Sequence, residues 1–251
     1  MKKDRKTEMG LRWRRFSRRS YAAFRSLHRE VSIGVLGVAM LASCAYAGKP
    51  GLNETLQRGD LLFCIEQPDA DGLGQAITSV TEGVGALAIS HVAIYVGPRQ
   101  GSDAAASDER WVIEAVPDGG VRLTRLEEFM EKAGRDAHDR PLLLEGRLRD
   151  TTDVPAMVER AMRYLGRPYD FLYEATDSAI YCSELVQISY LRSDGRAVFP
   201  TIGMTFRDAS GHIAAYWREL YAAHGRPVPE GEPGTNPGQL SRDTALVIII
   251  D

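Results

Sequence analysis

The chain has few cysteines: only Cys44, Cys64 and Cys182 occur in 251 residues. They are too few and too widely spaced for a disulfide framework or a zinc cluster. The five histidines form no HExxH motif, so we expect no metal site and no other cofactor. In an oxidising compartment a Cys64–Cys182 disulfide is one alternative. The position of Cys64 in the apolar run LLFCI favours packing as a small apolar side chain instead.

Nucleotide-binding motifs and a basic surface are also missing. Neither GxGxxG nor GxxxxGK occurs after residue 44. The net charge is −3, yet residues 1–30 carry 11 Lys/Arg against 3 Asp/Glu, a local balance of +8. Residues 31–43 carry no charged side chain, which leaves −11 for the part from Cys44 onward. A protein that binds nucleic acid needs a basic face, so we expect no nucleic-acid partner.

The apolar run at residues 31–43, VSIGVLGVAMLAS, has only 13 residues and is too short for an ordinary transmembrane helix. Its place after a basic leader is typical of a secretory signal, with Met9 as an alternative start. Residues 41–44, LASC, resemble a bacterial lipobox in which Cys44 is lipidated, whereas residues 45–47, AYA, offer ordinary cleavage. We therefore expect an exported protein of the cell envelope that a lipid on Cys44 anchors to the membrane.

The remaining pattern predicts one α+β domain. We assign residues 1–43 to a signal peptide with a lipobox, 44–57 to a linker and 58–251 to the domain, whose length is enough for a single core. Hydrophobic alternation predicts strands at 61–65, 89–97, 111–116 and 121–126, which suggest an antiparallel meander, and further strands at 141–148 and 246–250. Helical spacing predicts helices at 76–83, 126–133, 154–165, from 182 onward and at 212–223, and the Pro/Gly-rich stretch 225–238 is expected to lack regular structure.

Three residues could form a nucleophile, a base and a group that orients the base. Cys182 is expected to open a helix, and a helix N-terminus favours a thiolate. His91 lies on the strand face opposite to the apolar row, and Glu114 falls on a neighbouring strand, where its carboxylate could orient the imidazole. Glu184 or Asp170 could fill that third role instead. Taken singly, the three residues could equally be a buried helix cysteine, a solvated histidine and a surface glutamate.

Five segments carry a family resemblance. GDLLF, SHVAIYVG, VIEAVPDGGV, YLGRPYD and YCSELV, in that order, resemble the permuted, YiiX-like branch of the NlpC superfamily of papain-like cysteine hydrolases. FRDASG and EGEPGTNP are similar to exported members of that branch. The resemblance implies a circularly permuted papain-like fold, in which an antiparallel sheet packs against the helix that bears the nucleophile. In this family the histidine precedes the cysteine, as it does here.

The resemblance also implies roles for individual residues. The family's catalytic positions correspond to Cys182 as nucleophile, His91 as base and Glu114 as third member. Tyr169, Asp170 and Tyr181 are then expected near the nucleophile, where they would line a substrate pocket or orient the loop before the helix. The Tyr181 side chain, together with the Cys182 backbone N–H, could hold an oxyanion.

The implied function is that of a cell-envelope cysteine hydrolase of the amidase or peptidase type, which acts through a thioester intermediate. Peptides or acyl amides are the expected substrates, including cell-wall peptides and acylated amino acids. Two enzymatic alternatives use the same groups: a thiol acyltransferase, and a hydrolase of lipids or esters. A non-catalytic ligand-binding lipoprotein is the alternative from a different class of function.

Overall fold

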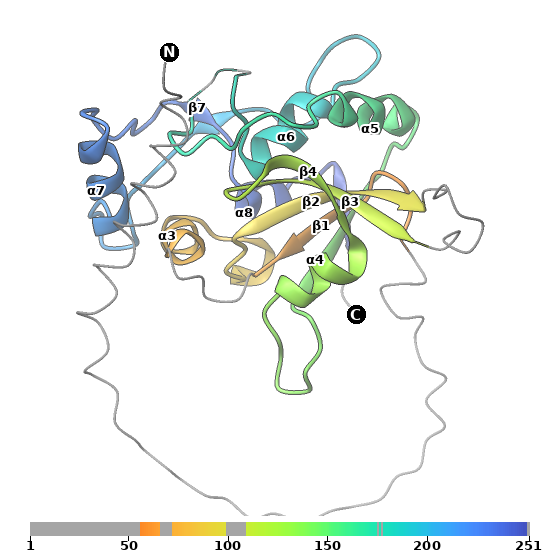
Figure 1. Ribbon diagram of the computed structural model, residues 1–251, viewed down its shortest axis with the longest axis horizontal. Coiled ribbons are helices and arrows are strands. Elements are labelled where there is room, and N and C mark those ends of the chain that lie inside the picture. Colours follow the sequence, from red (N-terminus) through yellow and green to blue (C-terminus); the bar gives the residue numbers. More distant parts are fainter. Residues whose placement is uncertain (1–55, 66–71, 99–108, 175, 177, 250–251) are drawn as a thin grey trace, which may run out of the picture.

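The computed structural model describes residues 56–65, 72–98, 109–174, 176 and 178–249. At its centre lies a six-stranded sheet with strand order β4-β3-β2-β1-β5-β8 (Figure 1). Each pair of neighbouring strands runs antiparallel. The strands are β1 (Leu61–Cys64), β2 (His91–Pro98), β3 (Arg110–Val116), β4 (Gly120–Arg125), β5 (Leu143–Leu148) and β8 (Leu246–Ile249).

Alternating side chains divide the core between the two faces of the sheet. Val92 and Ile94 of β2 belong to the larger apolar cluster. Ala93 and Tyr95 of the same strand belong to a smaller cluster on the other face. The division of β2 that its sequence predicts is therefore confirmed.

Helices cover both faces of the sheet (Figure 1). Helix α4 contacts β3 and β4 and contributes Leu126 and Phe129 to the smaller cluster. Helix α6 contacts β2 and β3 from the side of the larger cluster, and α5 packs against α6. The helices are α3 (Leu73–Val80), α4 (Leu126–Lys132), α5 (Val154–Met162), α6 (Cys182–Ser189), α7 (Ala215–Ala223) and α8 (Pro237–Ser241), with a 3₁₀ turn, η2, at Val84–Ala86.

The expectation that residues 225–238 lack regular structure is wrong at their C-terminal end. Strand β7 (Pro233–Gly234) pairs with β6 (Ile202–Gly203) in a second, two-stranded sheet. Helix α8 begins directly afterwards, because the side chain of Asn236 accepts a hydrogen bond from the Gln239 N–H and Pro237 occupies the first helical position. Asn at the N-cap followed by Pro is a helix start signal.

Other expected boundaries also differ, by up to three residues. Helix α3 starts at Leu73, three residues before the expected start at Ala76. Helix α5 ends at Met162, three residues before the expected end at Leu165, which is 39% exposed. Residues 163–166 form a turn that ends at Gly166, where φ is +82°. The signal peptide, the lipobox with Cys44 and nearly all of the linker lie outside the described residues.

Cys64 and Cys182 are both buried and neither forms a disulfide, so the alternative of a disulfide between them is not realised. Cys64 packs in the smaller cluster, as expected of a small apolar residue. Within the ranges that the structure describes, no helix has the length and apolar character needed to cross a membrane.

Candidate active site

Cys182 is the first residue of α6, where the sequence predicted a helix start. The preceding residue, Tyr181, has an extended backbone (φ −97°, ψ 169°), and its N–H donates to the Glu184 carboxylate at 3.3 Å. Glu184 therefore caps the helix that carries the cysteine, which is a structural role different from orienting a histidine. The backbone N–H of Cys182 belongs to the first turn, where such groups have no intrahelical acceptor.

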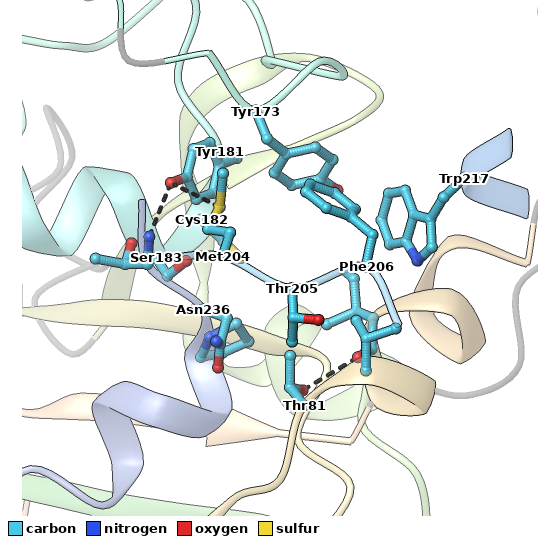
Figure 2. A pocket seen from close by; sticks show the side chains of 14 residues that line it. Thr81, Tyr173, Tyr181, Cys182, Ser183, Met204, Thr205, Phe206, Trp217 and Asn236 are labelled. Carbon is cyan, nitrogen blue, oxygen red and sulfur yellow. Dashed lines mark hydrogen bonds between the residues drawn. The ribbon is translucent and has the colours of Figure 1, made fainter. Parts of the chain in front are cut away.

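Cys182 is 3% exposed and lines a pocket next to the start of α6 (Figure 2). Tyr181 also lines this pocket. Its hydroxyl accepts a hydrogen bond from the Thr235 N–H at 3.1 Å and points to Sδ of Met204 at 3.9 Å. Burial raises the pKa of Tyr181 well above the usual range of a tyrosine. These contacts tie the tyrosine to the end of β7, so it forms the pocket wall as a neutral phenol.

Asp170 and Tyr169 lie in the loop before α6. The Asp170 carboxylate accepts hydrogen bonds from the N–H groups of Leu172 and Glu174, at 2.8 and 2.6 Å, and so shapes this loop. Burial outweighs these bonds and raises the pKa of Asp170 to about 6. The Tyr169 ring packs edge-on against Phe171 at 5.1 Å. Neither residue lines the pocket at Cys182, which leaves them the loop-ordering role that the sequence offered as an alternative.

His91 is the first residue of β2, and its ring lies on the face of the smaller cluster, 6.0 Å from the Phe129 ring. Nε2 of His91 is 2.8 Å from Oε2 of Glu114. Both side chains are buried, at 5% and 1% exposure. The pairing of β2 with β3, in which Ile94 is opposite Ile113, puts the two residues within reach of each other.

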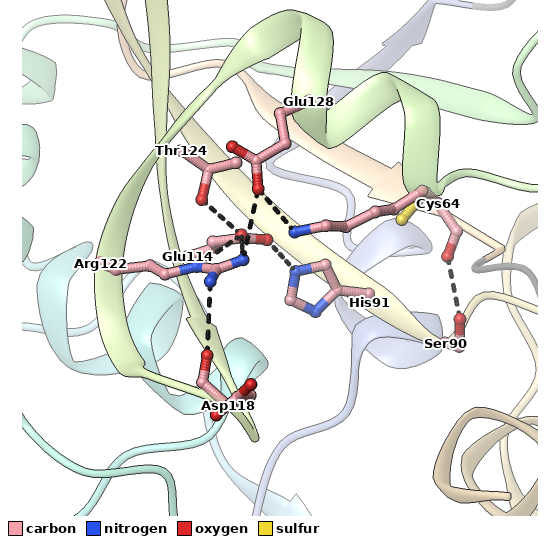
Figure 3. A network of polar contacts seen from close by, with 9 residues as sticks. Cys64, Ser90, His91, Glu114, Asp118, Arg122, Thr124 and Glu128 are labelled. Carbon is pink, nitrogen blue, oxygen red and sulfur yellow. Dashed lines mark hydrogen bonds and ion pairs between the residues drawn. The ribbon is translucent and has the colours of Figure 1, made fainter. Parts of the chain in front are cut away.

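Two side chains of β4 form hydrogen bonds with the other carboxylate oxygen of Glu114 (Figure 3). Oε1 accepts hydrogen bonds from the Thr124 hydroxyl at 2.6 Å and from the Arg122 guanidinium at 3.2 Å. Burial by itself would raise the pKa of Glu114. The hydrogen bond and charge of His91, with help from Thr124 and Arg122, outweigh burial and lower that pKa to about 2. Glu114 is therefore a carboxylate over the whole physiological pH range.

Backbone hydrogen bonds bring the start of α6 to the edge of the sheet where His91 lies. The Val121 N–H, at the start of β4, donates to the Arg167 carbonyl at 2.8 Å. The Ile180 N–H, two residues before Cys182, donates to the Pro168 carbonyl at 2.9 Å. Because β3 and β4 form a hairpin, the start of β4 is next to the end of β3, and antiparallel pairing puts that end beside the start of β2.

The structure thus brings His91 and Glu114 into direct contact and places Cys182 at the same edge of the sheet. The described contacts pair neither His91 nor Glu114 with Cys182, and neither residue lines the pocket beside the thiol.

Thr124 and Arg122 were not predicted from the sequence, although the VRLTRL strand follows a turn signal and Arg122 is directly opposite Glu114 in the ladder. The aromatic residues of the pocket wall, Tyr173, Phe206 and Trp217, were not predicted either, because no local sequence signal marks them.

Comparison with known proteins adds two findings. A family model described as the permuted papain-like amidase enzyme, YaeF/YiiX, C92 family, matches residues 55–250. The crystal structure of metalloprotein yiiX from Escherichia coli O157:H7 is similar with a TM-score of 0.59 and 23% identity, over 77% of this chain and 96% of that one. No match was found among curated proteins.

These two likenesses confirm the α+β, circularly permuted papain-like fold that the five sequence segments imply. In the described part of this chain, no group of three or more His, Cys, Asp and Glu side chains is placed to hold a metal ion.

Proposed function

Because this chain belongs to the family of permuted papain-like amidases that includes YaeF and YiiX, we propose that it is a cysteine amidase with Cys182 as nucleophile, His91 as base and Glu114 as the group that orients the base. One observation carries the proposal. The helix that starts at Cys182 packs on β2 and β3, the two strands that hold the buried His91–Glu114 pair.

The proposed reaction begins with transfer of the Cys182 thiol proton to His91. The thiolate attacks the carbonyl carbon of an amide, and the C–N bond breaks as His91 returns the proton to the leaving nitrogen. This step leaves a thioester on Cys182 and releases an amine. A water molecule then gives a proton to His91 and attacks the thioester, which releases a carboxylic acid and regenerates the thiol.

Glu114 would assist both proton transfers by binding the His91 imidazole at the nitrogen that does not exchange the proton. Since Nε2 of His91 faces the carboxylate, Nδ1 is the nitrogen that exchanges a proton with Cys182 or with the leaving group. A buried carboxylate at Nε2 fixes the tautomer and stabilises the imidazolium that forms during the reaction. The backbone N–H of Cys182, in the first turn of α6, would donate to the developing oxyanion.

The proposed setting is the cell envelope, with Cys44 as the lipid-bearing residue and peptides or acyl amides as substrates. The apolar run at residues 31–43 and the LASC segment that ends at Cys44 support export and anchoring. An amidase facing the envelope would meet cell-wall peptides and acylated amino acids.

A matched pair of cysteine variants tests the proposal. The full-length protein and its Cys182→Ala and Cys64→Ala variants are assayed for release of amine from a panel of acyl amides and peptides. Both cysteines are buried and outside any disulfide, but only Cys182 lies at a helix start, so Cys182→Ala should abolish turnover and Cys64→Ala should retain it. Turnover that survives in a folded Cys182→Ala protein would refute the nucleophile assignment.

A further inference from the structure

The buried carboxylate of Glu114 contacts a second basic group besides the imidazole of His91. Nε2 of His91 is 2.8 Å from Oε2, while Nε and Nη2 of Arg122 are 3.3 and 3.2 Å from Oε1. Figure 3 shows the guanidinium and the imidazole at the two oxygens of the same carboxylate. One buried negative charge is therefore shared between a permanent cation and a histidine that can gain or lose a proton.

The charge of Arg122 opposes protonation of His91. Arg122 already neutralises Glu114, so a proton on the imidazole would add an uncompensated positive charge at a buried position, which is costly. Without Arg122, the carboxylate and an imidazolium would form a balanced ion pair that retains the proton. Because His91 must be neutral to accept a proton from Cys182, the guanidinium favours the form that the proposed reaction needs.

The groups that face His91 from β1 and α4 add no charge of their own. Cys64 of β1 is opposite His91 in the ladder and packs in the smaller apolar cluster. The Phe129 ring of α4 lies 6.0 Å from the imidazole. A thiol in apolar surroundings is neutral at physiological pH, so neither residue competes with Arg122 in setting the charge around the ring.

The remaining charged groups nearby are paired or exposed. Glu128 of α4 is 3.9 Å from Arg122, but it is half exposed and also pairs with Lys132 at 3.1 Å, so water screens both. On α6, the Glu184 carboxylate accepts a hydrogen bond from the Tyr181 N–H. Arg122 is thus the cation that acts most directly on the carboxylate beside His91.

Thr124 keeps the carboxylate in place independently of Arg122. Its buried hydroxyl donates to Oε1 of Glu114 at 2.6 Å. The other contact of the guanidinium, from Nη1 to the Asp118 carbonyl at 3.3 Å, lies in the exposed turn between β3 and β4. Replacing Arg122 should therefore remove a charge while the orientation of Glu114 toward His91 is retained.

We propose that Arg122 is a positioning residue that acts through Glu114: its guanidinium takes up part of the carboxylate's negative charge, so that His91 stays neutral and can accept the proton of Cys182. The proton moves from Sγ of Cys182 to Nδ1 of His91, and Arg122 exchanges none. The inference rests on the proposed function and adds a group that sets the pH range of that activity.

NMR of the histidine rings tests the proposal without a substrate. The full-length wild type, Arg122→Gln and Arg122→Lys are labelled with ¹⁵N in the rings of their five histidines, and loss of a signal in His91→Gln assigns His91. In Arg122→Gln the midpoint of the His91 titration should rise by about one pH unit, because a nearby positive charge is gone. Arg122→Lys keeps a cation and should recover most of that rise.

The pH profile of activity gives a second measurement. Cys182 and His91 exchange one proton, so the profile of kcat/KM belongs to the pair and should move to higher pH by about one unit in Arg122→Gln. A substitution that only loosened the fold would lower kcat/KM without moving the profile. The matched control is Arg110→Gln, which removes another partly exposed cation of the sheet, paired with Glu127 at 3.0 Å, and should leave the profile unchanged.

The two measurements separate this inference from the proposed function. An unmoved His91 midpoint in folded Arg122→Gln would overturn the role of Arg122, even if the wild type hydrolyses amides. A midpoint that follows the charge of residue 122, in a protein without any amide hydrolysis, would reject the amidase and keep the charge balance. If Arg122→Gln does not fold, Arg122→Met retains the packing of the aliphatic stem and gives the same test.

Discussion

Nε2 of His91 lies 2.8 Å from Oε2 of Glu114, in a buried pair that joins two neighbouring strands of the sheet. Thr124 and Arg122 hold the other carboxylate oxygen. The pair is thus a carboxylate and an imidazole with fixed geometry, which is the arrangement that a base needs from its orienting partner.

The first prediction concerns the charge of Glu114. Glu114→Gln keeps the size of the side chain and a hydrogen bond but removes the charge that stabilises the imidazolium, so kcat should fall by more than about tenfold. The matched control is Glu128→Gln. Glu128 also contacts Arg122, at 3.9 Å, but is half exposed, and kcat should remain near wild type. Normal kcat in folded Glu114→Gln would remove Glu114 from the triad.

The second prediction is a pH dependence of stability that arises from Asp170. Burial raises the pKa of its carboxyl from 3.8 to about 6. The folded state therefore binds the proton more tightly than the unfolded state, so this stabilisation is complete below about pH 4 and is lost as the pH rises through about 6. The Asp170 residue is only 6% exposed, so the loss should be about 3 kcal/mol at most.

Urea unfolding between about pH 4.5 and 7 measures this effect, and Asp170→Asn should flatten the slope. Glu114 has the opposite effect on the pH dependence of stability, and its effect falls at lower pH. Its pKa is about 2 in the folded state against 4.5 for an ordinary glutamate, so its stabilisation is lost as the pH falls through that interval. A wild-type slope that persists in Asp170→Asn would assign the pH dependence to another group.

The third prediction concerns two glycines that have similar backbone angles but different surroundings. Gly120 (φ +67°) opens β4, and a Cβ there would overlap the Arg167 carbonyl in the loop that leads toward Cys182. Gly166 (φ +82°) has open space around it. Both alanine variants carry the strain of a positive φ, but Gly120→Ala should lower the free energy of unfolding by about 1–3 kcal/mol more than Gly166→Ala. Equal losses of unfolding free energy in the two variants would show that the close approach of Gly120 to the Arg167 carbonyl is unimportant.

The fourth prediction concerns membrane anchoring by a lipid on Cys44. In cells that export the protein, the wild type should sediment with the membranes, and Cys44→Ala should move into a soluble envelope fraction, because a lipid adds a strong membrane preference. Cys64→Ala serves as a control for the loss of a thiol and should remain with the membranes. A soluble wild-type protein would contradict the lipobox interpretation and favour cleavage after residues 45–47.

Local patterns were enough to predict most of the fold, because they depend on short-range periodicity. The alternation of β2 predicted which face His91 occupies, and the order of the strands predicted that Glu114 lies on a neighbour. The helix start at Cys182 followed from the helical spacing of residues 182, 185, 186 and 189, which share one stripe of the helix.

Long-range features could not be predicted in the same way. The pocket wall joins residues 77–81, 173, 204–206, 217 and 235–237, and only the folded chain brings them together. The hydrogen bond from the Thr124 hydroxyl to Glu114 depends on the register of the β3–β4 hairpin, in which Val112 is opposite Thr124. For α8 a local signal was present but missed, since Asn236-Pro237 stands in a stretch whose Pro and Gly content suggested loop.

The central claim is that Cys182 forms a thioester with the acyl half of an amide substrate. Its most direct test is acid quenching of the full-length enzyme during turnover, followed by mass mapping of its peptides. The account predicts the acyl mass on the peptide that contains Cys182, no adduct on Cys64, and loss of the adduct in His91→Ala. Sustained turnover with an unmodified Cys182, together with unchanged kcat in folded Cys182→Ala, would contradict it.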